Sequence, residues 1–121
     1  MNEDRAYLGH IRDCIRNITD DTQAGRDAFF ADRRIQDAVI RNLEVIGEAV
    51  KNLSAGLKED HPAVPWKQIA AMRDVLIHHY FGVKLDMVWQ VVAMHLPSLK
   101  TEVDRMLGDL QASGHSGPDR R

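Results

Sequence analysis

The sequence predicts an all-α fold, an antiparallel bundle of four to five helices in a single domain. Apolar residues recur at three- and four-residue steps along most of the chain, which is the period of an amphipathic helix. No segment reads as a convincing strand, and the chain contains no internal repeat or low-complexity tract. At 121 residues it is long enough to bury one core and too short to favour two domains.

The first two helices are predicted from their apolar stripes. One spans about residues 7–18, and Asp20 and Asp21 open a polar connection after it. The other spans about residues 32–53, with Gly56 marking its end. Cys14 falls in the first stripe, so we expect it to pack in the core, and a single cysteine cannot form an internal disulfide.

A loop over residues 58–65 is predicted to lead into the third helix, because Pro65 suits the first turn of a helix beginning at Trp66. That helix is expected to end near Gly82. A fourth helix follows residues 84–86, and Pro97 is predicted to kink or break it before a last helical piece that reaches Leu110. We place the domain at residues 1–112 and expect residues 113–121 to be a disordered tail.

Composition narrows the functional classes. Hydrophobic residues make up 44% and charged residues 28% of the chain, as in ordinary globular domains. No apolar run is long enough for a membrane span and the N-terminus does not resemble a signal peptide, so we expect a cytoplasmic protein. The net charge is −2, so a nucleic-acid partner would have to bind a local basic patch.

Residues 73–80 read Arg-Asp-Val-Leu-Ile-His-His-Tyr and carry the most informative chemistry. Arginine can bind a phosphate and stabilise charge that develops on it, and histidine transfers protons near neutral pH. Asp74 and His78 are four residues apart, so on a helix the carboxylate could orient the imidazole. Arg73 and His78 lie about 140° apart around a helix, which favours a two-fold dimer that brings both chains' groups into one cleft.

Three further observations carry less weight. Glu48 stands in an apolar stretch and should be paired or lie at an interface, with Arg41 two turns upstream as one possible partner. His78 and His79 point about 100° apart and cannot readily share one ion, so we predict no metal site. The alternative for residues 73–80 is a purely structural role, in which the charged residues form surface ion pairs, His79 is partly buried and Tyr80 caps the core.

The string Arg73, four residues, His78, one residue, Tyr80 resembles the R-x4-H-x-Y motif of HepT-like toxins, small helical proteins of the HEPN superfamily. The resemblance spans about residues 4–110. Further segments that are similar to the family are Ile46-Gly47-Glu48-Ala49, Pro65-Trp66, Ile69, Phe81 and Val88-Trp89.

The resemblance implies a metal-independent endoribonuclease toxin that acts as a homodimer without a cofactor on an RNA such as tRNA or mRNA. Arg73 and His78 would be catalytic, and His79, Glu48 and Arg41 are possible supports. It also implies a cognate antitoxin, a minimal nucleotidyltransferase that silences the toxin by transferring AMP to the motif tyrosine, here Tyr80.

Two other functional classes remain open from the sequence. The same fold could serve as a non-catalytic nucleotide-binding or regulatory partner of a nucleotidyltransferase, or as a structural dimerising bundle. The pairing of Arg73 with His78 favours the enzyme, because a scaffold has no need of an acid–base imidazole near a phosphate-binding arginine.

Overall fold

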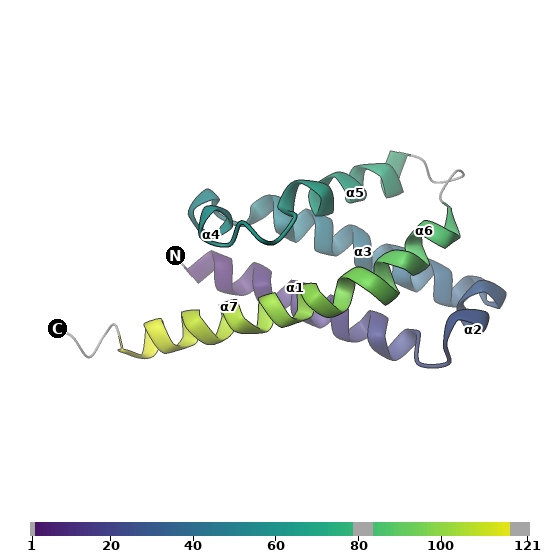
Figure 1. Ribbon diagram of the computed structural model, residues 1–121, viewed down its shortest axis with the longest axis horizontal. Coiled ribbons are helices and arrows are strands. Elements are labelled where there is room, and N and C mark those ends of the chain that lie inside the picture. Colours follow the sequence, from purple (N-terminus) through teal and green to yellow (C-terminus); the bar gives the residue numbers. More distant parts are fainter. Residues whose placement is uncertain (1, 79–83, 117–121) are drawn as a thin grey trace.

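The computed structural model describes residues 2–78 and 84–116, and within these ranges every regular element is a helix (Figure 1). This confirms the predicted all-α fold class. Three long helices are separate: α1 (Asn2–Asp21), α3 (Arg33–Asn52) and α5 (Trp66–His78). A nearly continuous helical run is formed by α6 (Leu85–Gln90), a π-helical turn (Val91–His95) and α7 (Leu96–Ser116). Two short helices, α2 (Arg26–Ala31) and α4 (Ala55–Asp60), lie in the connections.

The core forms where α1 packs against α3 and α7, and α5 packs mainly on α3 (Figure 1). The apolar stripes predicted for α1 and α3 are the buried ones, and Cys14 lies among them as expected. Burial, with a smaller contribution from the charge of Asp13, raises the pKa of the Cys14 thiol. The largest fully buried side chains are Phe29, Leu8, Ile11, Ile15, Ile18, Leu43, Ile46, Leu76 and Met106.

Two short helices replace segments that the sequence suggested were loops or helix ends. The connection after α1 contains α2, which buries Phe29 completely. The second long helix ends at Asn52 and not at Gly56, because Ser54 accepts a hydrogen bond from the Leu57 amide and starts α4. Helices of six residues are too short to produce a periodic apolar pattern, so they escape detection in the sequence.

Of the kink or break that the sequence predicts at Pro97, the break does not occur. The preceding turn is π-helical, and the Leu96 amide bonds to the Val91 carbonyl five residues earlier. This shift in the hydrogen-bond register ends immediately before Pro97, which then occupies the first turn of α7, where its missing amide hydrogen costs little. The chain therefore continues as helix to Ser116.

The helix ends bear on two other predictions. α7 includes residues 113–116, the start of the segment that we expected to be a disordered tail. The predicted end of the third helix at Gly82 lies outside the described residues, where α5 is described as far as His78. None of the helices in the described ranges is both long and apolar enough to cross a membrane.

Candidate active site at the α3–α5 contact

The contact between α3 and α5 is centred on Gly47. A methyl group at this position would lie 2.5 Å from the Arg73 Cβ and 3.2 Å from the Ile69 carbonyl oxygen. Only a residue without a Cβ allows α5 to approach α3 this closely. Gly47 therefore determines where the backbone of Arg73 lies relative to α3.

Two carboxylates hold the Arg73 side chain. Its Nε lies 2.8 Å from Glu48 Oε1 on α3, and its Nη1 lies 3.1 Å from Asp74 Oδ1 on α5. Arg73 is half-buried, with 27% of its side chain exposed, whereas Glu48 and Asp74 are 54% and 52% exposed. The head of a long, flexible side chain is thus fixed at the solvent edge of the helix pair.

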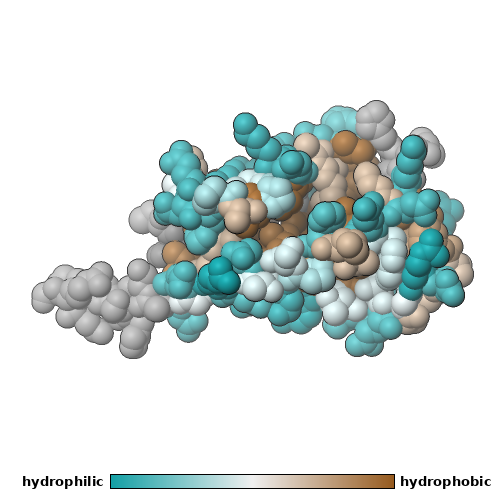
Figure 2. All heavy atoms as spheres, in the orientation of Figure 1, coloured by the Kyte–Doolittle hydropathy of each residue, from teal (hydrophilic) through white to brown (hydrophobic). Residues whose placement is uncertain are grey.

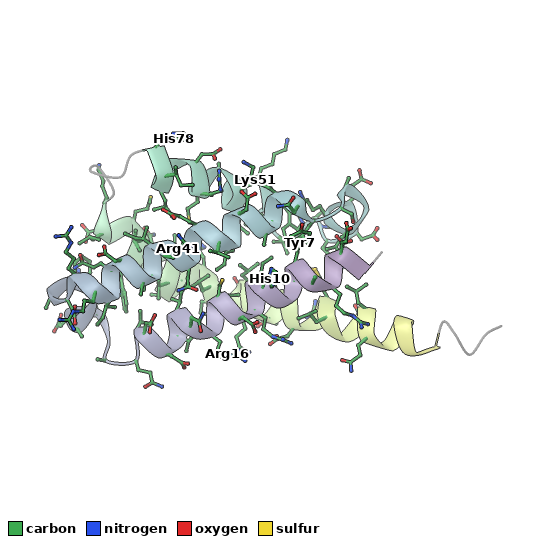
Figure 3. All side chains as sticks on the ribbon, turned by 180° about the vertical axis from the view of Figure 1, so that it is seen from behind. Tyr7, His10, Arg16, Arg41, Lys51 and His78 are labelled. Atoms are coloured by element: carbon green, nitrogen blue, oxygen red, sulfur yellow. The ribbon has the colours of Figure 1, made fainter. Side chains whose placement is uncertain are left out.

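A lysine extends this group of charges along α3. The Lys51 Nζ lies 3.8 Å from Asp74 Oδ1, and Lys51 is labelled on α3 in Figure 3. The Asn52 side-chain amide contacts Glu48 Oε2 at 3.4 Å. We call Glu48, Lys51, Arg73 and Asp74 the arginine cluster. Its formal charges sum to zero, so Arg73 is positioned without leaving a net positive patch.

Glu48 is paired with an arginine, as one interpretation of the sequence suggested, but the partner is Arg73. Arg41 lies exposed on α3, and the described residues include no ion pair between it and Glu48. An arginine on the neighbouring helix at close range outcompetes one that lies two turns away on the same helix.

His78 is the last described residue of α5 and is exposed to solvent (Figure 3). The Asp74 carboxylate does not accept a hydrogen bond from His78 in the described part of the chain, as the sequence had suggested it could, because it contacts Arg73 and Lys51 instead. The Asp74 carboxylate that contacts the Arg73 guanidinium lies on the face of α5 on which His78 follows one turn later.

Two of the predicted site residues, His79 and Tyr80, lie outside the described residues. The roles assigned to them remain predictions. Sequence reasoning also missed two site features, the close approach at Gly47 and the contact between Lys51 and Asp74. A glycine on the apolar stripe of an amphipathic helix was the available signal for the first.

The outward face of α5 carries an exposed row at four-residue spacing that comprises Lys67, Ala71 and Val75. Val75 is 42% exposed, although it is a large apolar residue in the middle of a helix. Beside this row an open apolar groove of about 540 Å³ runs between α5 and the helical run from α6 to α7, with Met72, Met87 and Leu99 among its lining residues. Hydrophobic side chains are visible in this region in Figure 2.

Among the described residues, no three His, Cys, Asp or Glu side chains gather closely enough to hold a metal ion. The groups available for chemistry at the α3–α5 contact are therefore an arginine, two carboxylates, a lysine and an imidazole. This set can bind a phosphate and transfer protons near it.

Comparisons with known proteins agree with this chemistry. A family model described as Ribonuclease HepT-like matches residues 11–106. A protein of Thermococcus cleftensis named "Probable ribonuclease HepT" is 43% identical over 101 residues, which cover 83% of this chain and 92% of that protein. A protein of Methanocaldococcus jannaschii named "Putative RNase" is 43% identical over 108 residues, covering 88% of this chain and 89% of that protein.

A second Methanocaldococcus jannaschii protein, named "Gamma-glutamylcyclotransferase and putative RNase", is 44% identical over 107 residues. The match covers 88% of this chain and 48% of that protein, so the chain spans about half the length of this relative. No solved structure matches the chain.

Proposed function

This chain belongs to the ribonuclease HepT-like family, and from that membership we propose that it is a metal-independent endoribonuclease and the toxin of a toxin–antitoxin pair. The observation that carries the proposal is the arginine cluster. Arg73 is fixed between Glu48 and Asp74 at the α3–α5 contact, and His78 follows Asp74 by one helical turn. These are the two residues that the R-x4-H motif marks.

In the proposed reaction the RNA 2′-hydroxyl attacks the adjacent phosphate. The bond from the 2′-oxygen to phosphorus forms, the bond from phosphorus to the 5′-oxygen breaks, and the 2′-proton is removed while the leaving 5′-oxygen gains one. The products are a 2′,3′-cyclic phosphate and a 5′-hydroxyl. His78 acts as general base or acid, and Arg73 stabilises the charge on the phosphorane. Every atom and proton balances without a metal or cofactor.

We assign the working unit as a homodimer in which the outward faces of two α5 helices pack together. Support comes from the exposed Val75 and the small Ala71 beside it, because small and apolar side chains let two helices approach. A two-fold axis there duplicates Arg73 and His78 across one cleft. The substrate would then be bound by groups from both chains.

The silencing mechanism we assign is transfer of AMP to Tyr80 by a nucleotidyltransferase antitoxin. The Tyr80 oxygen bonds to the α-phosphorus of ATP, the bond from that phosphorus to the bridging oxygen breaks, pyrophosphate leaves, and the phenol proton goes to solvent. The motif tyrosine follows His78 by two residues, so AMP on it would add a phosphate charge and an adenine close to the catalytic pair. RNA would be excluded by occupancy and by repulsion.

The deciding experiment is cleavage of total tRNA in EDTA by the parent protein and by His78→Ala, both expressed without the antitoxin. Intact-protein mass confirms that neither carries AMP. We expect the parent to cut and the variant to lose at least about 100-fold in rate, since general acid–base catalysis contributes roughly 10²–10⁴-fold. Thermal unfolding serves as the control, because exposed His78 should not affect the fold.

Intact RNA after incubation with the parent would contradict the nuclease proposal. If that protein still bound the antitoxin, a non-catalytic partner of the nucleotidyltransferase would be the better-supported function. Cleavage by the parent that EDTA abolishes would contradict metal independence while keeping the nuclease.

A further inference from the structure

The two carboxylates around Arg73 occupy different edges of its guanidinium group. A guanidinium binds a phosphate or carboxylate in a bidentate manner through one of two edges, Nε with Nη2 or Nη1 with Nη2. Glu48 contacts Nε and Asp74 contacts Nη1, so each edge already has one nitrogen engaged. Nη1 carries a second N–H, but a phosphate that bound through Nη1 and Nη2 would lie directly beside the Asp74 carboxylate. The repulsion between the two anions favours loss of the carboxylate from Arg73 when the phosphate binds.

The two carboxylates are not equivalent. Glu48 comes from the neighbouring helix and makes the shorter contact, at 2.8 Å. Asp74 is the next residue in the chain, makes a contact of 3.1 Å, and has Lys51 as a second cationic partner at 3.8 Å. When Asp74 leaves Arg73, the negative charge of Asp74 stays compensated by Lys51. Within the described residues, Glu48 forms an ion pair with Arg73 and with no other cation. Asp74 is therefore the carboxylate that costs less to displace.

We infer that Asp74 occupies the phosphate-binding edge of Arg73 in the free protein, that substrate phosphate replaces it, and that Lys51 is a positioning residue that holds the displaced carboxylate. The inference rests on the proposed function, since it takes a phosphodiester as the ligand of Arg73. It assigns opposite roles to the two carboxylates, because Glu48 orients the arginine for substrate and Asp74 competes with substrate. It also gives Lys51 a role that does not require contact with RNA.

The test measures binding of a fluorescein-labelled 2′-O-methyl RNA by fluorescence anisotropy in EDTA. This probe keeps the phosphates and cannot be cut, because its 2′-oxygen carries no proton. We expect Asp74→Asn to bind about threefold to tenfold more tightly than the parent, since it removes an exposed ion-pair partner of Arg73 and a negative charge beside the phosphate. The substitution keeps the size of the side chain.

The matched control is Asp37→Asn. Asp37 is exposed on α3, has an arginine partner of its own at 3.9 Å, and lies ten residues before Gly47. The Asp37→Asn variant loses the same charge at a position that does not contact Arg73, so we expect its affinity for the RNA probe to change less than twofold. Equal tightening in both variants would mean a general charge effect and would overturn the inference.

Lys51 is tested in two backgrounds. If it acts through Asp74, Lys51→Met weakens binding about twofold to fivefold in the parent and has no effect in the Asp74→Asn protein. An equal loss in both backgrounds would mean that Lys51 contacts RNA directly, and its assigned role would be wrong.

Cleavage of unmodified RNA by the parent is recorded alongside and separates the two proposals. A parent that cuts RNA, with an Asp74→Asn variant that binds no more tightly, overturns the inference and leaves the nuclease. A parent that binds the probe but cuts nothing, with the expected tightening in the variant, supports the inference and overturns the nuclease. A parent that neither binds nor cuts overturns both.

Discussion

The inner and outward faces of α5 are built on different principles. On the inner face, Gly47 lets the helix lie directly on α3, and Glu48 holds the head of Arg73. On the outward face, Ala71, Val75 and His78 are exposed to solvent. The inner face therefore fixes the Arg73 side chain, for which we propose phosphate binding, and the outward face exposes His78, for which we propose proton transfer.

The largest effect should come from filling the space at Gly47. Alanine there places a methyl 2.5 Å from the Arg73 Cβ, so α5 must move away from α3. We expect a loss of about 1–3 kcal/mol in the free energy of unfolding, as for overpacked cores, and at least a tenfold loss in cleavage. Chemical denaturation and an RNA cleavage assay measure the two quantities.

Gly9→Ala is the matched control for this substitution. Gly9 also lies inside a long helix, α1, but a methyl there would meet nothing within 4 Å. Its expected effect has the opposite sign, a gain of about 0.5–1 kcal/mol from the better helix propensity of alanine. Stabilisation by alanine at both positions would show that α5 does not depend on the close approach at Gly47.

The outward face is tested by Val75→Asp. Because this side chain is already 42% exposed, the substitution should leave the stability of one chain within about 0.5 kcal/mol while placing two like charges across the proposed two-fold seam. We expect sedimentation equilibrium to detect monomers, and RNA cleavage to fall at least tenfold.

Met94→Asp removes another exposed apolar side chain, on the π-helical turn and outside the α5 row. It should leave the oligomeric state unchanged. If only Met94→Asp dissociates the dimer, the interface lies on the α6–α7 side and not on α5. If the Val75→Asp protein remains a fully active dimer, the proposed α5–α5 interface is wrong.

The contrast between the two faces also explains what the sequence could and could not predict. The apolar periodicity located α1, α3 and α5, and the motif spacing singled out Arg73 and His78 as site residues, which stays a prediction, because both patterns are properties of one segment. The pairing of Glu48 with Arg73 and the approach at Gly47 depend on how two helices cross. The Asp74–His78 contact was expected from spacing along one helix, and in its place Asp74 contacts Arg73 and Lys51.

The smallest effect on stability, and the finest test of the inner face, is expected from Glu48→Gln. Glutamine keeps an oxygen that can accept from Arg73 Nε but removes the charge, and an ion pair with a 54% exposed carboxylate is worth only about 0–1 kcal/mol. Thermal unfolding should therefore change little. We expect cleavage to fall about threefold to tenfold, mainly in kcat, because a less firmly oriented guanidinium stabilises the phosphorane less well.

The comparison with Asp74→Asn makes this result decisive, since both variants remove one negative charge in contact with the same guanidinium. If Arg73 simply responds to local charge, both should bind RNA more tightly and change kcat alike. If the inner face positions Arg73 and the Asp74 contact only occupies it, Glu48→Gln lowers kcat without tightening binding, whereas Asp74→Asn tightens binding. Two equal charge changes on one arginine then separate orientation of the catalytic group from competition with its substrate.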